Sequence, residues 1–140
     1  TAPSSGAAAV SLGDGRLALI GGQDSGGQRI ADAWVVDPKS LTATRVGGAL
    51  ARGRAGHMAV MVDGSVVVLG GSTAGGPAPQ LEILDSKLAR TGATPAQVPR
   101  TGAVSAALGK GSLLIAGGSS SKGPTRVLEV YQTGRKLPAL

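Results

Sequence analysis

The chain has 140 residues, with 24 glycines, 8 prolines and no cysteine or phenylalanine, and its 14 basic and 8 acidic side chains give a formal net charge of +6. Its length allows one domain, the absence of cysteine excludes disulfide bonds and thiol nucleophiles, and no apolar stretch approaches the roughly 20 residues that span a bilayer. The charge favours anionic partners, but the two aromatic residues, Trp34 and Tyr131, offer almost nothing on which bases could stack, which disfavours nucleic-acid binding.

An internal repeat organises the chain. Three apolar runs each end in a pair of glycines, and we predict that they form the second strand of each unit: LALIGG at 17–22, VVVLGG at 66–71 and LLIAGG at 113–118. The first glycines of these pairs lie 49 and 47 residues apart. A period of this size is typical of stacked structural repeats.

The elements of each unit follow in a fixed order. A first strand meets a tight glycine turn and then the second strand, which predicts a hairpin; these segments are 9–16, 59–65 and 105–112. After a polar loop, a third strand is predicted at 33–37, 81–85 and 128–132, and a weaker fourth strand at 42–46, around 89–93 and at 135–140. The second-strand runs are apolar at successive positions, which indicates a sheet covered on both faces.

The repeat resembles the kelch unit of β-propellers. That unit tends to begin with an R-x-G-H-like element, which stands here as R-A-G-H at 54–57 and R-T-G-A at 100–103, with only S-S-G-A at 4–7. The stretch 32–46 is similar to the family's aromatic strand, D-P turn and fourth strand, although the tryptophan of that fourth strand is missing in all three units. The resemblance implies an all-β propeller with about three four-stranded blades in a single segment, 1–140, with blade units near 4–50, 51–97 and 98–140.

Three blades are too few to close a propeller, because closed rings generally use four to eight. The sequence therefore predicts two uncovered apolar blade faces that need a partner. Either the remaining blades of a longer chain, which we favour, or a second copy in a six-bladed ring would cover them. The chain is expected to be soluble and without a membrane span, and its compartment stays open, since a mature secreted or periplasmic protein would look the same.

The resemblance also points to one end of the blades as a binding face. In kelch propellers the loops before strand one and between strands two and three commonly bind ligands, and Arg54 and Arg100 stand there at equivalent positions. Two such arginines can hold a carboxylate or phosphate; the alternative is that each braces its own loop. The expected binding residues are Arg54, His57, Arg100, Gln23, Asp24, Ser72, Thr73, Ser119 and Lys122.

We find no self-sufficient catalytic set in the sequence and expect neither a cofactor nor a metal. His57 is the only histidine, without a G-x-S-x-G nucleophile elbow, and we expect it to hydrogen-bond across to a neighbouring blade. Glu82 and Glu129 look like an acid/base pair, but they share one register, where the first unit has Trp34, which favours a structural role. The copper-radical chemistry of galactose-oxidase-like propellers needs histidines, tyrosines and a cysteine, which this chain cannot supply alone.

The sequence thus leads to three hypotheses about function. The first is a non-catalytic kelch-like scaffold whose loops bind a protein or an acidic ligand. The second is a part of a sugar-directed propeller enzyme whose catalytic residues lie mostly outside this chain. The third is a structural subunit of a larger assembly, and the fold itself does not decide, because propellers host enzymes and binding proteins alike.

Overall fold

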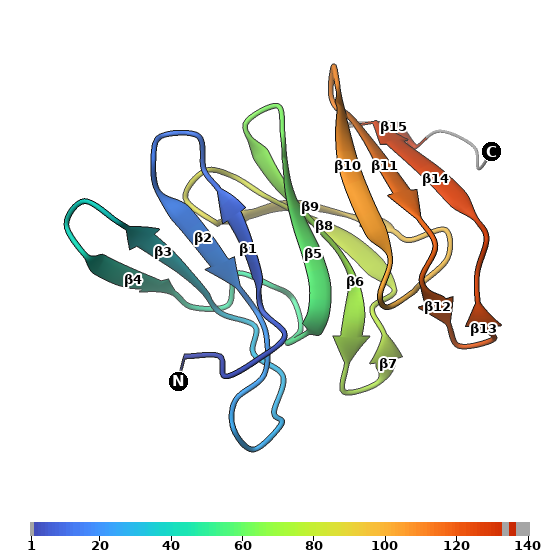
Figure 1. Cartoon of the computed structure of the whole chain (residues 1–140), viewed down its shortest axis with the longest axis horizontal. Helices are drawn as coiled ribbons and strands as arrows, with labels where there is room; N and C mark the ends of the chain where they lie inside the picture. The colour runs from blue at the N-terminus through green and yellow to red at the C-terminus, as the bar shows by residue number, and fades with distance from the viewer. Residues whose placement is uncertain (1, 133–134, 137–140) are drawn as a thin grey trace.

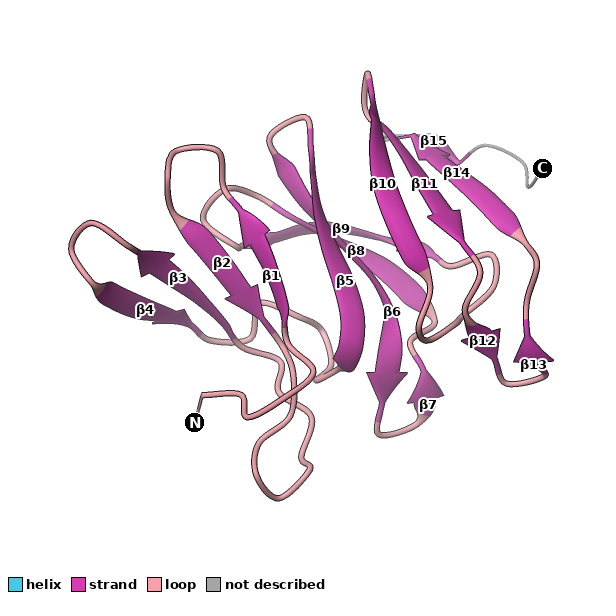
Figure 2. Cartoon of the chain, viewed as in Figure 1, coloured by secondary structure: helices cyan, strands magenta, loops and turns pink. Residues whose placement is uncertain are grey.

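The computed structural model describes residues 2–132 and 135–136, and it is built from strands, turns and loops (Figures 1 and 2). Three four-stranded antiparallel sheets, the blades of a propeller, follow one another along the chain. In the first blade the strand order is β1 (Ala8–Ser11), β2 (Leu17–Ile20), β3 (Ala33–Asp37) and β4 (Thr42–Val46). Among the described residues no helix is long and apolar enough to cross a membrane.

The second and third blades repeat this order. The second contains β5 (Ala55–Val62), β6 (Ser65–Thr73), β8 (Gln80–Leu84) and β9 (Arg90–Pro95), and the third contains β10 (Val104–Gly109), β11 (Ser112–Ala116), β14 (Leu128–Gln132) and β15 (Arg135–Lys136). Two short pairings lie in the loops that follow the second strands: β7 (Gly76–Pro77) with β6, and β12 (Ser119–Ser120) with β13 (Gly123–Pro124).

The predicted strands are confirmed within a few residues. The sequence did not indicate β7, β12 or β13, because these two-residue pairings form inside polar loops without an apolar pattern. Of the last predicted strand, at 135–140, residues 137–140 lie outside the described part of the chain. The glycines of the predicted hairpin turns do adopt positive φ, for example +92° at Gly15, +78° at Gly64 and +71° at Gly111, the conformation that such short connections require.

The three blades stand side by side, and their first strands β1, β5 and β10 are neighbours (Figure 1). Each blade is entered through a short segment before its first strand, which we call the lead-in. The lead-ins and the loops between second and third strands lie at the same end of the blades, the lower end in Figure 1. We call this end the loop face; it comprises the lead-ins 2–7, 47–54 and 96–103 and the loops 21–32, 72–80 and 117–127.

Two apolar clusters fill the spaces between the blades. One joins residues of the first and second blades, such as Ile20, Val66 and Leu84, and the other joins the second and third blades through residues such as Leu81 and Leu113. In the second blade the four successive side chains at 66–69 are all buried, which confirms the prediction of a sheet covered on both faces. In β2 and β11 burial alternates instead, because each outer blade has only one neighbour.

The glycine pairs connect one blade to the next. A Cβ atom on Gly21 would lie 2.6 Å from Cε1 of His57 and 2.8 Å from the carbonyl oxygen of Arg54, both in the second blade. The N–H of Gly22 donates a hydrogen bond of 2.8 Å to that same carbonyl. The second and third blades repeat the arrangement, since the N–H of Gly71 donates to the carbonyl of Arg100 over 3.1 Å. The first glycine of these pairs thus leaves room for the next blade, and the N–H of the second glycine donates a hydrogen bond to that blade.

This contact predicts different costs for two glycine-to-alanine substitutions. Gly21 and Gly64 both have positive φ, +60° and +78°, but a Cβ on Gly64 would meet nothing within 4 Å. Gly64→Ala should therefore lower the free energy of unfolding by about 1–2 kcal/mol through left-handed backbone strain alone. Gly21→Ala should cost about 1 kcal/mol or more in addition, because of overpacking between the blades. Urea denaturation of both variants checks this, and equal losses would contradict it.

Candidate functional site

The first feature of the loop face is a buried ion pair in the second blade. Arg54, in the lead-in to β5, and Glu82, on β8, are 2% and 1% exposed, and the guanidinium donates to Oε1 of the carboxylate. Nη1 of Arg54 also donates to the carbonyl of Gln80 over 3.1 Å, and Oε2 of Glu82 accepts the N–H of Ala51 over 2.7 Å. Burial lowers the pKa of Arg54 while Glu82 opposes the shift, and the guanidinium stays cationic.

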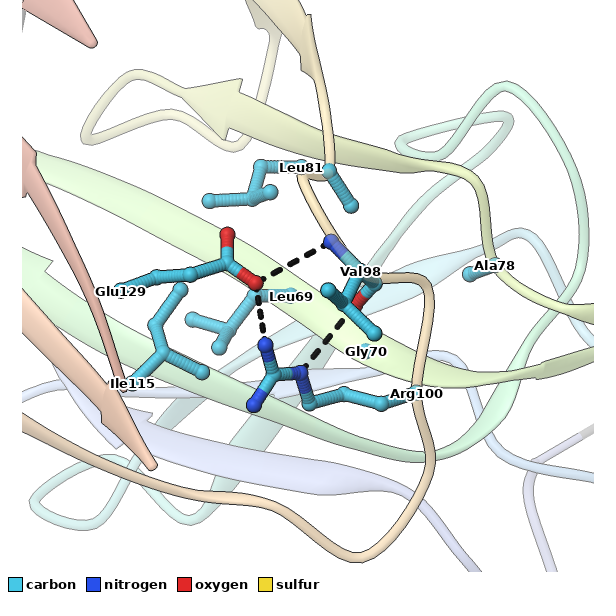
Figure 3. Close-up of a pocket in the computed structure, with 9 residues that line it drawn as sticks. Leu69, Gly70, Ala78, Leu81, Val98, Arg100, Ile115 and Glu129 are labelled. Carbon is cyan, nitrogen blue, oxygen red and sulfur yellow. Dashed lines mark hydrogen bonds and ion pairs between the residues drawn. The ribbon is translucent and has the colours of Figure 1, made fainter. Parts of the chain in front are cut away.

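The third blade contains the same arrangement (Figure 3). Arg100, 3% exposed, donates to the carboxylate of Glu129, which is 2% exposed. The arginine also donates to the carbonyls of Gly117 and Val127 over 2.9 and 2.8 Å, and Oε1 of Glu129 accepts the N–H of Val98 over 3.1 Å. Beside the pair lies a cavity of about 10 Å³, which has room for about one water molecule.

These contacts revise the hypothesis that Arg54 and Arg100 bind a ligand together. Each guanidinium is paired inside its own blade, so the two do not converge on one anion, and the alternative role, bracing the lead-in, is the one that the structure shows. Glu82 and Glu129 have the structural role that their common register indicated. Each accepts backbone N–H groups of the segment that arrives from the preceding blade, at Ala51 in one case and at Val98 in the other.

The first blade lacks this ion pair. Ser4 and Trp34 occupy the positions of the arginine and the glutamate, and the lead-in is held differently: the N–H and Oγ of Ser4 donate to the carbonyl of Gln23 over 2.8 and 3.1 Å. The glycine two residues later nevertheless has the same positive φ in each blade: +67° at Gly6, +64° at Gly56 and +64° at Gly102. The left-handed turn at this glycine is therefore common to all three blades.

His57 is buried against the preceding blade and does not reach the surface of the loop face. Its side chain on β5 is 6% exposed and abuts the glycine pair at Gly21. Within the described residues neither ring nitrogen makes a hydrogen bond of normal geometry, but the imidazole interacts with the backbone of Ile20 in the neighbouring blade, so the expected contact between the blades is present. Desolvation, assisted by the charge of Arg54 and partly opposed by the carbonyl of Ile20, lowers the pKa of His57 to about 4.

Gln23 and Ser72 lie at the boundary between the first and second blades. Arg29, which the sequence analysis missed, connects them: its Nη1 donates to Oε1 of Gln23 and its Nη2 to Oγ of Ser72 over 3.2 Å. An open cleft of about 340 Å³ runs along this loop and is also lined by Asp24 and Asp32. Two of the predicted binding residues are therefore brought together, but as partners of an arginine that joins two blades.

Asp24 and Thr73 shape their own loops. Oδ1 of Asp24 accepts the N–H groups of Gly26 and Gln28, each over 2.9 Å. Oγ1 of Thr73 likewise accepts from the backbone two residues on and donates to the carbonyl of Gly76 over 3.1 Å. Ser120, the equivalent residue of the third blade, forms the same pair of bonds. Asp, Ser and Thr favour such turns because their side-chain oxygens can hydrogen-bond to the nearby backbone. Their position, two residues after the glycine pair in each unit, was a sequence signal for these turns.

The exposed charges of the loop face are basic. Ser119 is tied through its backbone to Thr101 over 2.8 Å, but Lys122 is exposed, as are Arg52 and Arg126, which the sequence analysis also missed. These three cations form no ion pair within the described part of the chain. Arg52 lines a cavity of about 150 Å³ together with Thr73, Gln80 and the Arg54–Glu82 pair, among other residues. The surface of this face is therefore suited to attract an anionic group.

Comparison with known proteins supports the architecture. The chain superimposes on the solved structure of YjhT, a kelch-repeat β-propeller protein, with a TM-score of 0.79 and 18% sequence identity. The fold is that of propeller blades. The match covers 96% of this chain but 51% of YjhT, so the chain spans about half the length of that propeller. No protein-family model and no curated protein sequence matches the chain.

Proposed function

We propose that the chain is a kelch-like propeller segment that acts as a non-catalytic scaffold and that its loop face binds a protein or another ligand with exposed acidic groups. The observation that carries this proposal is the set of three exposed cations on the loop face, Arg52, Lys122 and Arg126, without an ion partner among the described residues. The buried arginines of the same face support it indirectly, because they fix the backbone that carries these side chains.

The charge distribution gives this face its selectivity. Exposed cations interact weakly one by one, but several on one face attract an anionic partner and orient it as it approaches. The two buried carboxylates, Glu82 and Glu129, are neutralised by their own arginines and repel an acidic ligand little. The binding should therefore be sensitive to salt and located at this end of the blades.

A fluorescein-labelled octaglutamate peptide tests the proposal by fluorescence anisotropy. We expect the chain to bind this probe at low salt, and we expect the double variant Arg52→Ala/Arg126→Ala to bind it about tenfold more weakly, since two exposed ion pairs contribute at most about 1 kcal/mol each. The affinity of the unmodified chain should fall as salt is added.

A matched control has the same change in charge at the other end of the blades. Lys39 and Lys87 are exposed in the β3–β4 and β8–β9 turns, and Lys39→Ala/Lys87→Ala should retain nearly the full affinity. An equal loss in both double variants would show that the probe responds to net charge and not to the loop face. That result, or no binding of the probe at low salt, would contradict the proposal.

A further inference from the structure

The two outer blade faces carry apolar residues at positions that are buried between blades elsewhere in the same chain. Leu128 and Val104 of the third blade are 40% and 67% exposed, whereas at the same register of the second blade Leu81 is 2% exposed and Met58 is half-buried. The latter two pack against the third blade. The third blade therefore presents to solvent the apolar positions with which the second blade binds its neighbour.

On the opposite side of the molecule, the first blade leaves the complementary face open. Leu17 of the first blade is 43% exposed, but its counterparts Val66 and Leu113 are 0% and 1% exposed and pack against the preceding blade. The third blade thus leaves open the face that would contact a following blade, and the first blade leaves open the face that would contact a preceding blade. Faces of these two kinds already bind each other twice in this structure, between the first and second and between the second and third blades.

The backbone groups that connect neighbouring blades are unpaired at the same two places. Gly118 is equivalent to Gly22 and Gly71, but within residues 2–132 and 135–136 its N–H has no backbone acceptor, and a Cβ on Gly117 would meet nothing within 4 Å. The carbonyl of Ser4, equivalent to those of Arg54 and Arg100, accepts no hydrogen bond from the described residues. Among the described residues, a backbone donor on one open face and a backbone acceptor on the other are therefore without a partner.

The first blade differs from the other two at the register of the buried glutamates. In the other blades the glutamate on strand three accepts the N–H groups of the segment from the preceding blade. At this register the first blade has Trp34, which pairs with Leu19 in the β2–β3 ladder and is partly exposed. An indole in place of the carboxylate offers apolar surface, so this face suits an apolar contact with a neighbouring blade.

We propose that the occupant of both open faces is a second copy of this chain, packed head to tail so that two sets of three blades close one six-bladed ring. In each of the two equivalent junctions the third blade of one copy meets the first blade of the other, and the N–H of Gly118 donates to the carbonyl of Ser4 of the second copy. A symmetric pair of this kind leaves no blade face uncovered. The match to about half of the YjhT propeller agrees with this size.

Light scattering behind a sizing column tests the ring. At physiological salt, over a hundredfold range of concentration, we expect the mass to reach a plateau at about 27 kDa, twice the 13.6 kDa of the chain. A mass of 13.6 kDa throughout would overturn the proposal. A mass that rises without a plateau would also overturn it, because faces that pair without closing build an open filament.

Two face variants and a mixture show which surfaces pair. Val104→Glu alters the open face of the third blade, where Val104 is 67% exposed, and Leu17→Glu alters that of the first. Each variant alone should be monomeric, because every junction then contains one altered face. An equimolar mixture should regain dimers, since it offers one unaltered face of each kind. Loss of the dimer without recovery on mixing would overturn the head-to-tail arrangement.

Leu41→Glu is the matched control for these variants. Leu41 is 89% exposed but lies in the β3–β4 turn, away from either blade face, so this variant should keep the dimer mass. If it dissociates as well, association depends on exposed leucines in general and the proposal fails. Far-UV circular dichroism of each monomeric variant should show unchanged strand content, which separates a lost junction from a lost fold.

Gly117→Ala probes the junction at the level of single atoms. In the isolated chain the new Cβ has free space, but in the ring it would approach the carbonyl of Ser4 of the second copy as a Cβ on Gly21 would approach that of Arg54. We expect the dimer to dissociate at least tenfold more readily. Gly109→Ala has the same backbone strain, with φ of +81° and no neighbour within 4 Å, and should leave dissociation unchanged. Equal behaviour of the two would overturn the predicted junction.

Discussion

Replacing Glu82 by alanine should lower the free energy of unfolding by about 3–5 kcal/mol, the usual cost of removing one partner of a buried ion pair. Arg54 would keep its buried position, at 2% exposure, without a carboxylate to balance its charge. The N–H of Ala51 would lose its acceptor as well. Glu129→Ala should have a comparable effect in the third blade, where it leaves Arg100 unpaired at 3% exposure.

Urea denaturation at one fixed protein concentration measures this loss, because any association of the folded chain contributes to its apparent stability. Asp14→Ala is the control: it removes the ion pair with Arg16, whose side chains are 49% and 40% exposed, and should change the midpoint far less. The double variant Arg54→Met/Glu82→Leu should recover much of the loss, since it leaves no buried charge unpaired; Arg90, which also contacts Glu82, is 43% exposed. A single substitution of Glu82 that costs no more than Asp14→Ala would contradict the structural role of the pair.

The architecture could be predicted from the sequence because each of its signals is local and occurs three times. An apolar run that ends in a glycine pair marks the second strand, and a turn with glycine at positive φ marks the hairpin before it. A single copy of such a pattern is weak, but three copies in one register identify blades. The exposed outer faces followed from the blade count alone, since a blade without a neighbour cannot bury both sides.

The roles of Arg54 and Arg100 depend on contacts that single motifs do not encode. Each arginine pairs with a glutamate 28 or 29 residues away, on strand three of the same blade, and the pairing is decided by which face of the sheet strand three presents. A signal was nevertheless present in the repeats. The arginine and the glutamate occur together in the second and third units and are both replaced in the first, by Ser4 and Trp34, as expected of residues that need each other.

The environment of His57 could not be predicted from the sequence either. The R-A-G-H element indicates a contact with the preceding blade but not whether the imidazole finds a hydrogen-bond partner there. The side chain fits against the free space of Gly21, and this apolar, backbone-lined contact is what removes water from the ring. The desolvation that results has a consequence for stability that can be measured.

Lowering the pH from 7 to 4 should destabilise the chain by about 3 kcal/mol more than it destabilises a His57→Gln variant. The pKa of His57 is about 4 in the folded state and about 6.5 when the chain is unfolded. Between these values the unfolded chain binds a proton that the folded chain does not, so protonation favours unfolding. The stabilisation is complete above pH 6.5, is lost progressively as the pH falls, and stops changing below about 4.

Urea midpoints of the unmodified chain and of His57→Gln, taken between pH 7.5 and 4, separate this effect from the carboxylates. Asp14, Asp32 and Asp37 have pKa values lowered by hydrogen bonds from neighbouring N–H groups and arginines, and they contribute equally to both proteins. The difference between the two proteins therefore isolates His57. Because the proton must enter a contact between two blades, its cost is a measure of how tightly the second blade is held against the first; parallel pH profiles would mean that the imidazole is hydrated and that this junction opens.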